Sequence, residues 1–356
     1  MQKYKTPLVC AACLAYAALL LSHPELGTAA LRDGLFLCAE RLIPSLLPFL
    51  FLAGFLLRSG AAALIGKLFA PLTRQLFRLP AICAPVVLMA LSGGYPVGLS
   101  LAASLVRSGQ IPAAAARRMT RFCLGAGPAF VVLGVGQSLL GSSRAGWILF
   151  TALIVSALLI GLLLPQGISM PSRTHIPPHG NESGATSLGG ALSESIESAA
   201  RQMLNICVWT LLFGTLCAYL PLFVHNEYAY PAACALLEVA AGSQSAASLG
   251  SLPLIAAALA WGGLCVHCQI LGPLKVCGQS LPRFWFWRMV HAGLAALICR
   301  ALLLIFPATL PDLALSVSAM PSAQLWQFST PAALGLAAMG AGVLYSGFRR
   351  EVFTNE

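Results

Sequence analysis

The chain has 356 residues, of which 58% are hydrophobic and only 9% are charged, and its mean hydropathy is +0.83. Soluble globular domains carry about 25% charged residues, so the composition excludes that class and indicates a polytopic membrane protein. The net charge of +10 does not indicate nucleic-acid binding, because the 21 Lys and Arg residues fall in loops between apolar spans and not in one patch.

Most of the twelve cysteines lie inside apolar spans, where a free thiol packs as a small hydrophobic side chain. We therefore expect no disulfide framework of the kind that holds small secreted domains together. The stretch LCVHCQ offers Cys265, His267 and Cys268 as zinc ligands, but a structural zinc site takes four ligands, usually from two separated pairs. Without a partner pair, the sequence predicts no metal site and no resident cofactor.

The first predicted crossing covers residues 8–22 and follows a basic start. It lacks a convincing small-residue cleavage site, so we expect a membrane anchor over residues 1–30 and not a signal peptide. After a polar connection, residues 34–57 form the second crossing. Residues 58–80 then supply a basic loop, which the positive-inside rule places in the cytoplasm.

The next apolar stretch contains LMALSGGYPVGLSLAASLV, residues 88–106, which a turn at 92–96 interrupts. Basic clusters flank it at 58–80 and 107–121. A single crossing would place one cluster outside, against the charge rule, whereas a segment that enters and returns keeps both inside. Residues 81–106 are therefore predicted to form a re-entrant helical hairpin, whose irregular tip must be buried in protein or face a water-filled cavity.

Residues 122–140 and 146–164 are predicted to cross out and back. The Pro-, Gly- and Ser-rich residues 165–192 follow, and we expect them to form a flexible cytoplasmic linker. Ser193 then provides a predicted N-cap for an amphipathic helix. The apolar part of this helix crosses outward over residues 203–222.

Residues 232–252 repeat the interrupted pattern, with breaks predicted at Glu238 and at residues 242–244. An apolar span over 254–274 follows and leads to three basic residues. These three are cytoplasmic only if residues 232–252 also enter and return, this time from outside. The three basic residues are Lys275, Arg283 and Arg288. The last two predicted crossings cover residues 286–308 and 330–347.

The predicted fold is thus an all-α polytopic membrane protein of about eight crossings and two re-entrant hairpins. A first repeat over residues 31–164 recurs with opposite orientation over residues 193–308, and a C-terminal loop and helix occupy 309–356. Inverted repeats with interrupted helices at the midplane are typical of secondary transporters. The alternative is a plain ten-helix bundle whose glycines form close packing faces.

Glu238 is the acidic residue well inside the second hairpin, and an ionisable residue at membrane depth is by default a functional hypothesis. Its roles would be to bind a coupling cation, exchange a proton or contact substrate; the alternative is a cap near the interface. His267 lies in the same span as Gln269; a histidine ordinarily titrates near physiological pH and is therefore a candidate for function, and the alternative is a histidine bonded to a carbonyl. Three glycine-rich sites would let backbone amides and helix N-termini approach an anion, or would serve helix packing. They are Gly93-Gly94, Gly125/Gly127-Pro128 and Gly262-Gly263.

Five segments, ERLIPSLLPFLFLAGFLL, LSGGYPVGLSLAASLVRSGQI, RRMTRFCLGAGPAFVV, LLEVAAG and WGGLCVHCQ, occur in this order over roughly residues 30–305. In order and spacing they resemble the YlbJ/SpoVV-type sporulation integral membrane proteins, which carry nucleoside-recognition (Gate) repeats. The resemblance implies an architecture similar to that of concentrative nucleoside transporters, whose hairpins meet at the substrate. It also implies a part in moving dipicolinic acid across a membrane around the developing spore.

The chain departs from the family pattern at two places, Leu124-Gly125 and Ala240-Ala241, where relatives carry hydrogen-bonding side chains. Its ligand would then differ from theirs or be held more by backbone amides. Combining the resemblance with the residues themselves gives the candidate substrate-binding set. These residues are Ser92, Gly93, Gly94, Tyr95, Pro96, Gly98, Gly125, Gly127, Pro128, Glu238, Gly242, Ser243, Gln244, Gly262, Gly263, His267 and Gln269.

We therefore expect a cell-membrane transporter or facilitator for a small polar, anionic solute, with dipicolinic acid during sporulation as the leading candidate and both termini cytoplasmic. Its partners would be the solute and the lipid bilayer. An enzyme is not expected, because no nucleophile motif surrounds Ser92. A nucleoside-type solute transporter and a non-transporting scaffold for spore assembly remain alternatives. The coupling ion, Na⁺ or H⁺, and a homo-oligomeric state are left open.

Overall fold

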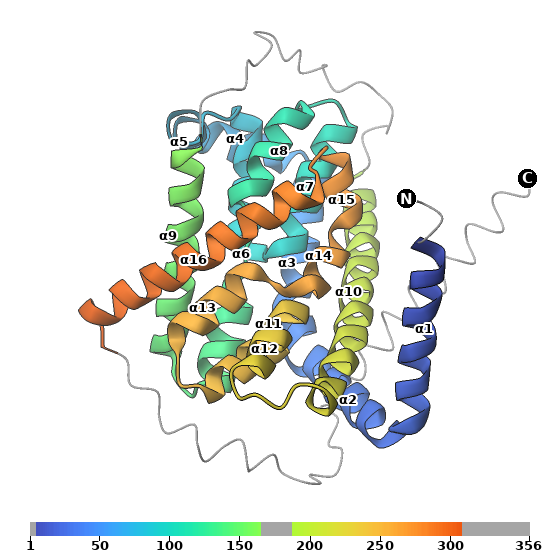
Figure 1. The fold of residues 1–356 in the computed structure, drawn as a ribbon. Helices are drawn as coiled ribbons and strands as arrows, with labels where there is room; N and C mark the ends of the chain where they lie inside the picture. Colours follow the sequence, from blue (N-terminus) through green and yellow to red (C-terminus); the bar gives the residue numbers. More distant parts are fainter. Residues whose placement is uncertain (1–4, 165–186, 308–356) are drawn as a thin grey trace, which may run out of the picture.

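The computed structural model describes residues 5–164 and 187–307, and every regular element in these ranges is a helix (Figure 1). This confirms the all-α class. Within the described residues, five helices are long and apolar enough to cross a membrane, and three shorter apolar helices accompany them, as expected for a polytopic membrane protein. The five are Pro24–Arg58, Ser143–Leu163, Leu188–Leu222, Leu252–Gln269 and Leu281–Ile305, and the shorter three are Val9–Ser22, Ala81–Gly93 and Ala129–Leu139.

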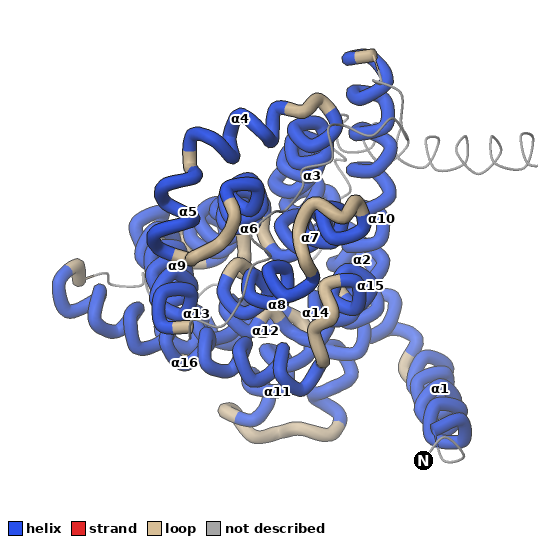
Figure 2. Tube along the Cα trace, turned by 90° about the horizontal axis from the view of Figure 1, so that it is seen from above, coloured by secondary structure: helices blue, strands red, loops and turns tan. Residues whose placement is uncertain are grey.

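The predicted crossings 8–22 and 122–140 thus correspond to helices from the shorter group. The predicted crossing 330–347 and most of the predicted linker lie outside the described residues. Helix α1 (Lys5–Ser22) stands at the margin of the molecule in both Figure 1 and Figure 2.

Helix α2 (Pro24–Leu37) continues through the π-helix η2 (Cys38–Leu42) into α3 (Ile43–Arg58). The connection expected before residue 34 is therefore wrong. Pro24 lies in the first turn of α2, where its missing N–H costs no hydrogen bond and its fixed φ favours a helix.

The basic segments gather at one end of the molecule. Helices α4 (Ala61–Leu68), α5 (Ala70–Leu76), α8 (Ala113–Phe122) and α15 (Leu271–Val276) all lie at the top of Figure 1. Residues 58–80, predicted as a loop, instead form the two short helices α4 and α5, which curve around the outside of the bundle in Figure 2. Both clusters that flank residues 81–106 are at the same end, as a re-entrant hairpin requires.

Each of the two interrupted segments forms a helical hairpin. After a short 3₁₀ turn, η3 (Ala81–Cys83), helices α6 (Ala84–Gly93) and α7 (Tyr95–Arg107) pack against each other and are joined at Gly94. Helices α11 (Ala229–Leu237) and α12 (Val239–Ser248) do the same and are joined at Glu238. The re-entrant position of these hairpins in a bilayer remains a prediction.

The break predicted at residues 242–244 is wrong, whereas the break at Glu238 is confirmed. Glu238 has extended backbone and caps α12, so the chain turns there. Gly242 lies inside α12, and a Cβ on it would lie only 2.3 Å from the Cα of Ala235. This glycine therefore lets the two hairpin helices approach each other and does not interrupt the helix.

Two predicted crossings contain an irregular break, the first near its start and the second near its middle. Helix α8 ends at Phe122, residues 123–128 are irregular, and the π-helix η4 (Ala129–Leu139) follows. Helix α13 (Leu252–Trp261) is separated by Gly262 from α14 (Gly263–Gln269), which leads into α15. The predicted crossing 254–274 therefore corresponds to the interrupted candidate span Leu252–Gln269, and the predicted crossing 122–140 is helical only from Ala129 onward.

The long helices α9 (Ser143–Leu163), α10 (Leu188–Tyr219) and α16 (Leu281–Ile305) enclose these elements. A short 3₁₀ turn, η5 (Leu220–Leu222), ends α10. The N-cap predicted at Ser193 is wrong: α10 begins five residues earlier, where the Ser187 hydroxyl accepts a hydrogen bond from the Gly190 amide at 3.2 Å.

The order of elements repeats along the chain. Helix α3, the α6–α7 hairpin, the broken helix α8/η4 and α9 are followed by α10, the α11–α12 hairpin, the broken helix α13/α14 and α16. In Figure 1 the first hairpin runs inward from the end that carries α4, α5 and α8, and the second runs inward from the opposite end. The two hairpins therefore meet in the interior.

Replacing Gly242 by Ala is expected to destabilise the fold by about 1–3 kcal/mol, because the new methyl group overlaps Ala235. Gly214→Ala in α10 is the matched control: nothing lies within 4 Å of its Cβ position, and alanine gains about 1 kcal/mol in helix propensity. Thermal unfolding in detergent measures both changes. A Gly242→Ala protein as stable as the Gly214→Ala protein would contradict the hairpin packing.

Candidate functional site

The tip of the first hairpin depends on one glycine. Gly94 has φ +85° and ψ −173°, a conformation that side chains with a Cβ rarely adopt. Tyr95 and Pro96 then start α7, and the fixed φ of proline suits this first turn. A Cβ on Gly94 would lie 3.2 Å from the amide nitrogen of Gly127, so the tip lies directly against the irregular residues 123–128.

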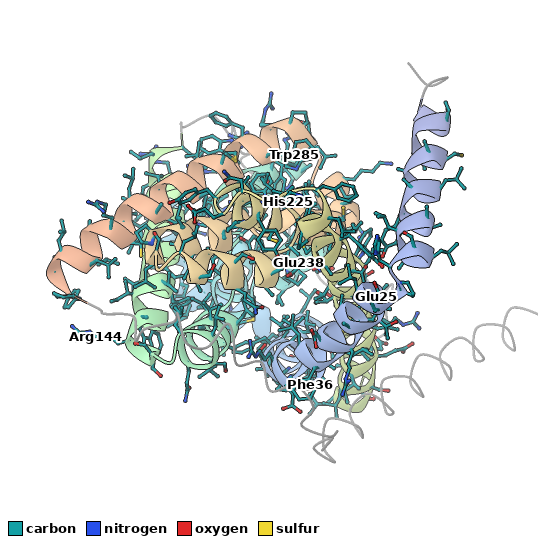
Figure 3. All side chains as sticks on the ribbon, turned by 60° about the horizontal axis from the view of Figure 1, so that its bottom comes forward. Glu25, Phe36, Arg144, His225, Glu238 and Trp285 are labelled. Carbon is teal, nitrogen blue, oxygen red and sulfur yellow. The ribbon has the colours of Figure 1, made fainter. Side chains whose placement is uncertain are left out.

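The tip of the second hairpin carries a buried carboxylate. Glu238 is 3% exposed, and its Oε2 accepts a hydrogen bond of 2.7 Å from the amide of Ala241. The side chain therefore caps the positive end of α12. Figure 3 shows Glu238 inside the bundle, whereas Glu25 and Arg144 lie at its margin. Among the described residues, Glu238 is the only buried acidic side chain.

The break between α13 and α14, at Gly262 and Gly263, contacts both hairpins. Gly262 has φ +86°, and a Cβ on it would lie 2.8 Å from the Tyr95 ring. A Cβ on Gly263 would lie 2.9 Å from the carbonyl oxygen of Leu237, next to Glu238. The two hairpin tips and the two helix breaks therefore meet at one place in the interior.

Tyr95 forms hydrogen bonds with backbone carbonyl groups at this meeting point. Its hydroxyl lies 2.6 Å from the carbonyl oxygen of Leu259 and 2.8 Å from that of Ala260, and donates to them. Both carbonyls belong to the last turn of α13, where the helix itself supplies no partners. The side chain of the first hairpin thereby fixes the end of the second broken helix.

A cavity of about 60 Å³, which we call the central cavity, lies at this meeting point. One water needs roughly 10–15 Å³ in this measure, so the cavity has room for a few waters. The predicted site residues that line it are Gly94, Tyr95, Pro96, Gly127, Glu238 and Gln269. Residues that the sequence analysis missed complete the lining: Leu42, Leu46, Ala126, Phe130, Ile206, Thr210, Val239, Ala240 and Val266.

Thr210 is the polar member of the missed set, and it is 4% exposed on α10. A lone threonine among apolar residues in CVWTLLFG was the only sign of it in the sequence. Leu42 belongs to the π-helix η2, which no pattern in the sequence indicated. The walls of the cavity are therefore mostly apolar, with Tyr95, Glu238, Gln269 and Thr210 as the side chains that carry polar atoms.

The remaining predicted residues lie outside the lining. The Ser92 hydroxyl donates to the carbonyl of Leu88 in its own helix, at 2.8 Å, and Ser243 donates to Val239 at 2.7 Å. Glycines close to the breaks shape the backbone without facing the cavity. The predicted residues outside the lining are Ser92, Gly93, Gly98, Gly125, Pro128, Gly242, Ser243, Gln244, Gly262, Gly263 and His267.

His267 is buried away from the cavity, between two aromatic rings. Its Nε2 lies 2.9 Å from the carbonyl oxygen of Trp261, and its ring makes edge contacts with Trp261 and Phe284. The alternative of a histidine bonded to a neighbouring carbonyl is therefore the arrangement found. Among the described residues, no group of three or more His, Cys, Asp or Glu side chains is placed to hold a metal ion.

Arg288 was expected in the cytoplasmic loop, but it is 0% exposed in the interior. Its guanidinium donates to the carbonyl of Leu124 and, at 3.1 Å, to that of Arg121. These carbonyls belong to the end of α8 and to the irregular segment that follows. The positive charge thus lies at the negative end of α8. It also holds in place the irregular segment, which contains the cavity-lining residue Gly127.

His291 extends this network. Its Nδ1 lies 3.2 Å from Arg288, which can only donate, so Nδ1 accepts and Nε2 carries the proton. Nε2 then donates to the carbonyl of Leu153 in α9 at 3.1 Å. One neutral histidine therefore joins α16 to α9, and Arg288 links it to the end of α8.

Arg288→Leu is expected to lower the free energy of unfolding by at least about 3 kcal/mol. Buried hydrogen bonds from a charged donor contribute about 1.5–3 kcal/mol each, and the two carbonyls would lose their partner. Arg300→Leu, an exposed arginine on the same helix, is the control and should change it by less than about 0.5 kcal/mol. Thermal unfolding in detergent distinguishes them. Equal stability of the two variants would show that other contacts hold the α8 break.

A comparison with known proteins agrees with the motifs. The chain is 30% identical over 164 residues to the sporulation integral membrane protein YlbJ of Bacillus subtilis (strain 168). The match covers 46% of this chain and 40% of YlbJ, so the chain matches less than half the length of that relative. No protein-family model and no solved structure matches the chain. Over the matched region, the chain is similar to this sporulation integral membrane protein.

Proposed function

We propose that the chain is a secondary transporter or facilitator for a small polar, anionic solute, with dipicolinic acid during sporulation as the leading candidate. The observation that carries this proposal is the buried Glu238 at a cavity where two hairpin tips and two helix breaks meet. Interrupted helices around a midplane site are the arrangement that transporters use. A relative named as a sporulation membrane protein supports the physiological setting.

The charges around the central cavity suit an anion that moves together with a cation. The N-terminus of α7 has no side-chain cap, and Gly94, Tyr95 and Pro96 line the cavity beside it. Its free amides favour an anionic group. The N-terminus of α12 is already occupied by the carboxylate of Glu238. An anion near that carboxylate is repelled unless a proton or Na⁺ neutralises it, so Glu238 is the proposed coupling residue.

The size of the central cavity implies a conformational change during transport. Pockets that hold a drug-sized ligand are about 300–1,000 Å³, whereas the central cavity has about 60 Å³. An aromatic solute therefore fits only when the hairpins move apart. Apolar walls formed by Leu46, Phe130 and Ile206 would then contact the ring of the solute.

The proposed orientation follows from the basic residues. Helices α4, α5, α8 and α15 share one end of the molecule, and on the positive-inside rule we propose that this end faces the cytoplasm. Both termini are proposed to be cytoplasmic as well. We also propose that the chain is not an enzyme. Ser92, His267 and Glu238 each bond to a backbone group, and of the three only Glu238 lines the cavity.

A nucleoside-type solute is the second candidate. Thr210, Gln269 and Glu238 offer hydrogen-bonding groups that suit hydroxyl groups as well as carboxylates. Uptake assays with both solutes distinguish the two candidates, and a non-transporting scaffold predicts uptake of neither.

Proteoliposomes that contain the chain are expected to accumulate dipicolinic acid when a proton or Na⁺ gradient is applied. Glu238→Gln should reduce accumulation to the equilibrium level, because the amide neither binds a proton nor attracts a cation. Glu227→Gln is the matched control, since Glu227 is an exposed acid in the preceding loop. Radiolabelled uptake with each gradient measures the effect.

Two results would contradict the proposal. Absence of uptake of either solute by the unaltered chain would favour the scaffold. Accumulation by the Glu238→Gln protein equal to that of the Glu227→Gln protein would remove Glu238 from the coupling step.

A further inference from the structure

A second cavity, of about 610 Å³, lies where α8 meets the start of α16, and it shares no residue with the central cavity. We call it the interface cavity. The elements that line it, α8 and the start of α16, lie at the end of the molecule that carries the basic segments (Figure 1). Its lining consists of Arg121, Ser280, Pro282, Arg283, Phe286 and Trp287.

The interface cavity concentrates positive charge. Arg121 and Arg283 both line it, and the lining contains no acidic residue. The Nε of Arg121 is buried without a hydrogen-bond partner among the described residues, and no ion pair found in those residues includes either arginine. Burial, and then the charges of Arg283 and Arg117, lower the pKa of Arg121, yet an arginine stays protonated in proteins. Such a cluster is stabilised by a bound anion.

The start of α16 adds donors to the same cavity. This helix has 25 residues, and its N-cap, Ser280, makes no capping hydrogen bond through its side chain. The first amides of a helix have no partners within it and carry a partial positive charge. The hydroxyl of Ser280 and the helix end therefore point to an anion with several oxygen acceptors, such as a phosphate group.

The outer side of the interface cavity is aromatic. Phe286 in the lining is 58% exposed, and the neighbouring Trp285 is 40% exposed. Figure 3 shows Trp285 on the α16 part of the structure. Aromatic side chains of this kind are enriched where a membrane meets water. The cavity is open to the surface, and it therefore sets two arginines beside an exposed apolar face that suits an acyl chain.

From these contacts we infer that the interface cavity binds the phosphate headgroup of an anionic phospholipid from the basic side of the membrane. Arg121, Arg283 and the start of α16 hold the phosphate, and Trp287 and Phe286 contact the glycerol and acyl part. Basic pockets between membrane helices on the cytoplasmic side are suited to such headgroups. Free phosphate offers the same oxygens but no apolar part, so it would bind more weakly.

The test titrates the detergent-solubilised full chain with phosphatidylglycerol, with phosphatidylcholine or with inorganic phosphate, and follows binding by native mass spectrometry and thermal shift. The double variant Arg121→Gln/Arg283→Gln should weaken phosphatidylglycerol binding at least about tenfold, which corresponds to about 1.4 kcal/mol. Lys67→Gln/Arg74→Gln removes the same charge from exposed residues at the same end and should leave binding unchanged.

Each outcome supports or overturns the inference. Equal phosphatidylglycerol binding by the two double variants would overturn the site. Binding of phosphatidylcholine as tight as that of phosphatidylglycerol would overturn the role of the arginine charges. A response to inorganic phosphate but to neither lipid would show that free phosphate, and not a lipid headgroup, occupies the site. If the double variant does not fold, Arg283→Gln alone remains a test, because that side chain is exposed and its loss should weaken binding in the same direction.

Discussion

Backbone groups at a helix break in an apolar interior need partners from the protein, and this constraint organises the structure. Each unpaired N–H or C=O in such a medium costs several kcal/mol. The chain breaks its helices at Gly94, at residues 123–128, at Glu238 and at Gly262. The four breaks are close to one another, so partners for one come from the elements next to it.

Three buried side chains pair with backbone groups next to these breaks. Glu238 accepts from the first turn of α12, Tyr95 donates to the last turn of α13, and Arg288 donates to the end of α8. Each one therefore has a structural role that is independent of any solute. The same bonds place a carboxylate and an uncapped helix end at the central cavity, which links the stability of the fold to the proposed transport.

The sequence predicted the first hairpin well, because basic clusters on both sides of residues 81–106 leave few other arrangements. It predicted the second hairpin less accurately. Gly242 looked like a break, whereas in the structure it is a packing glycine against Ala235. Single glycines have both uses, and only the neighbouring helix decides between them.

The candidate site was predictable where a residue interrupts an apolar segment, as at Gly94, Gly127 and Glu238. His267 has the same appearance in the sequence, yet its partner is the carbonyl of Trp261. Arg288 was missed for the opposite reason: its place near the end of a basic loop suggested exposure. Its true surroundings depend on carbonyls more than 160 positions earlier in the chain, which no local pattern reveals.

The most direct test of this structure is the side from which introduced cysteines react in sealed vesicles. In a background without the exposed Cys10 and Cys13, single cysteines would replace the exposed residues Lys67, Ser108, Ser143 and Glu227. A membrane-impermeant thiol reagent should modify positions 67 and 108 from one side and positions 143 and 227 from the other. Modification of positions 67 and 108 from opposite sides would contradict the re-entrant hairpin, and with it the meeting of the two tips around Glu238.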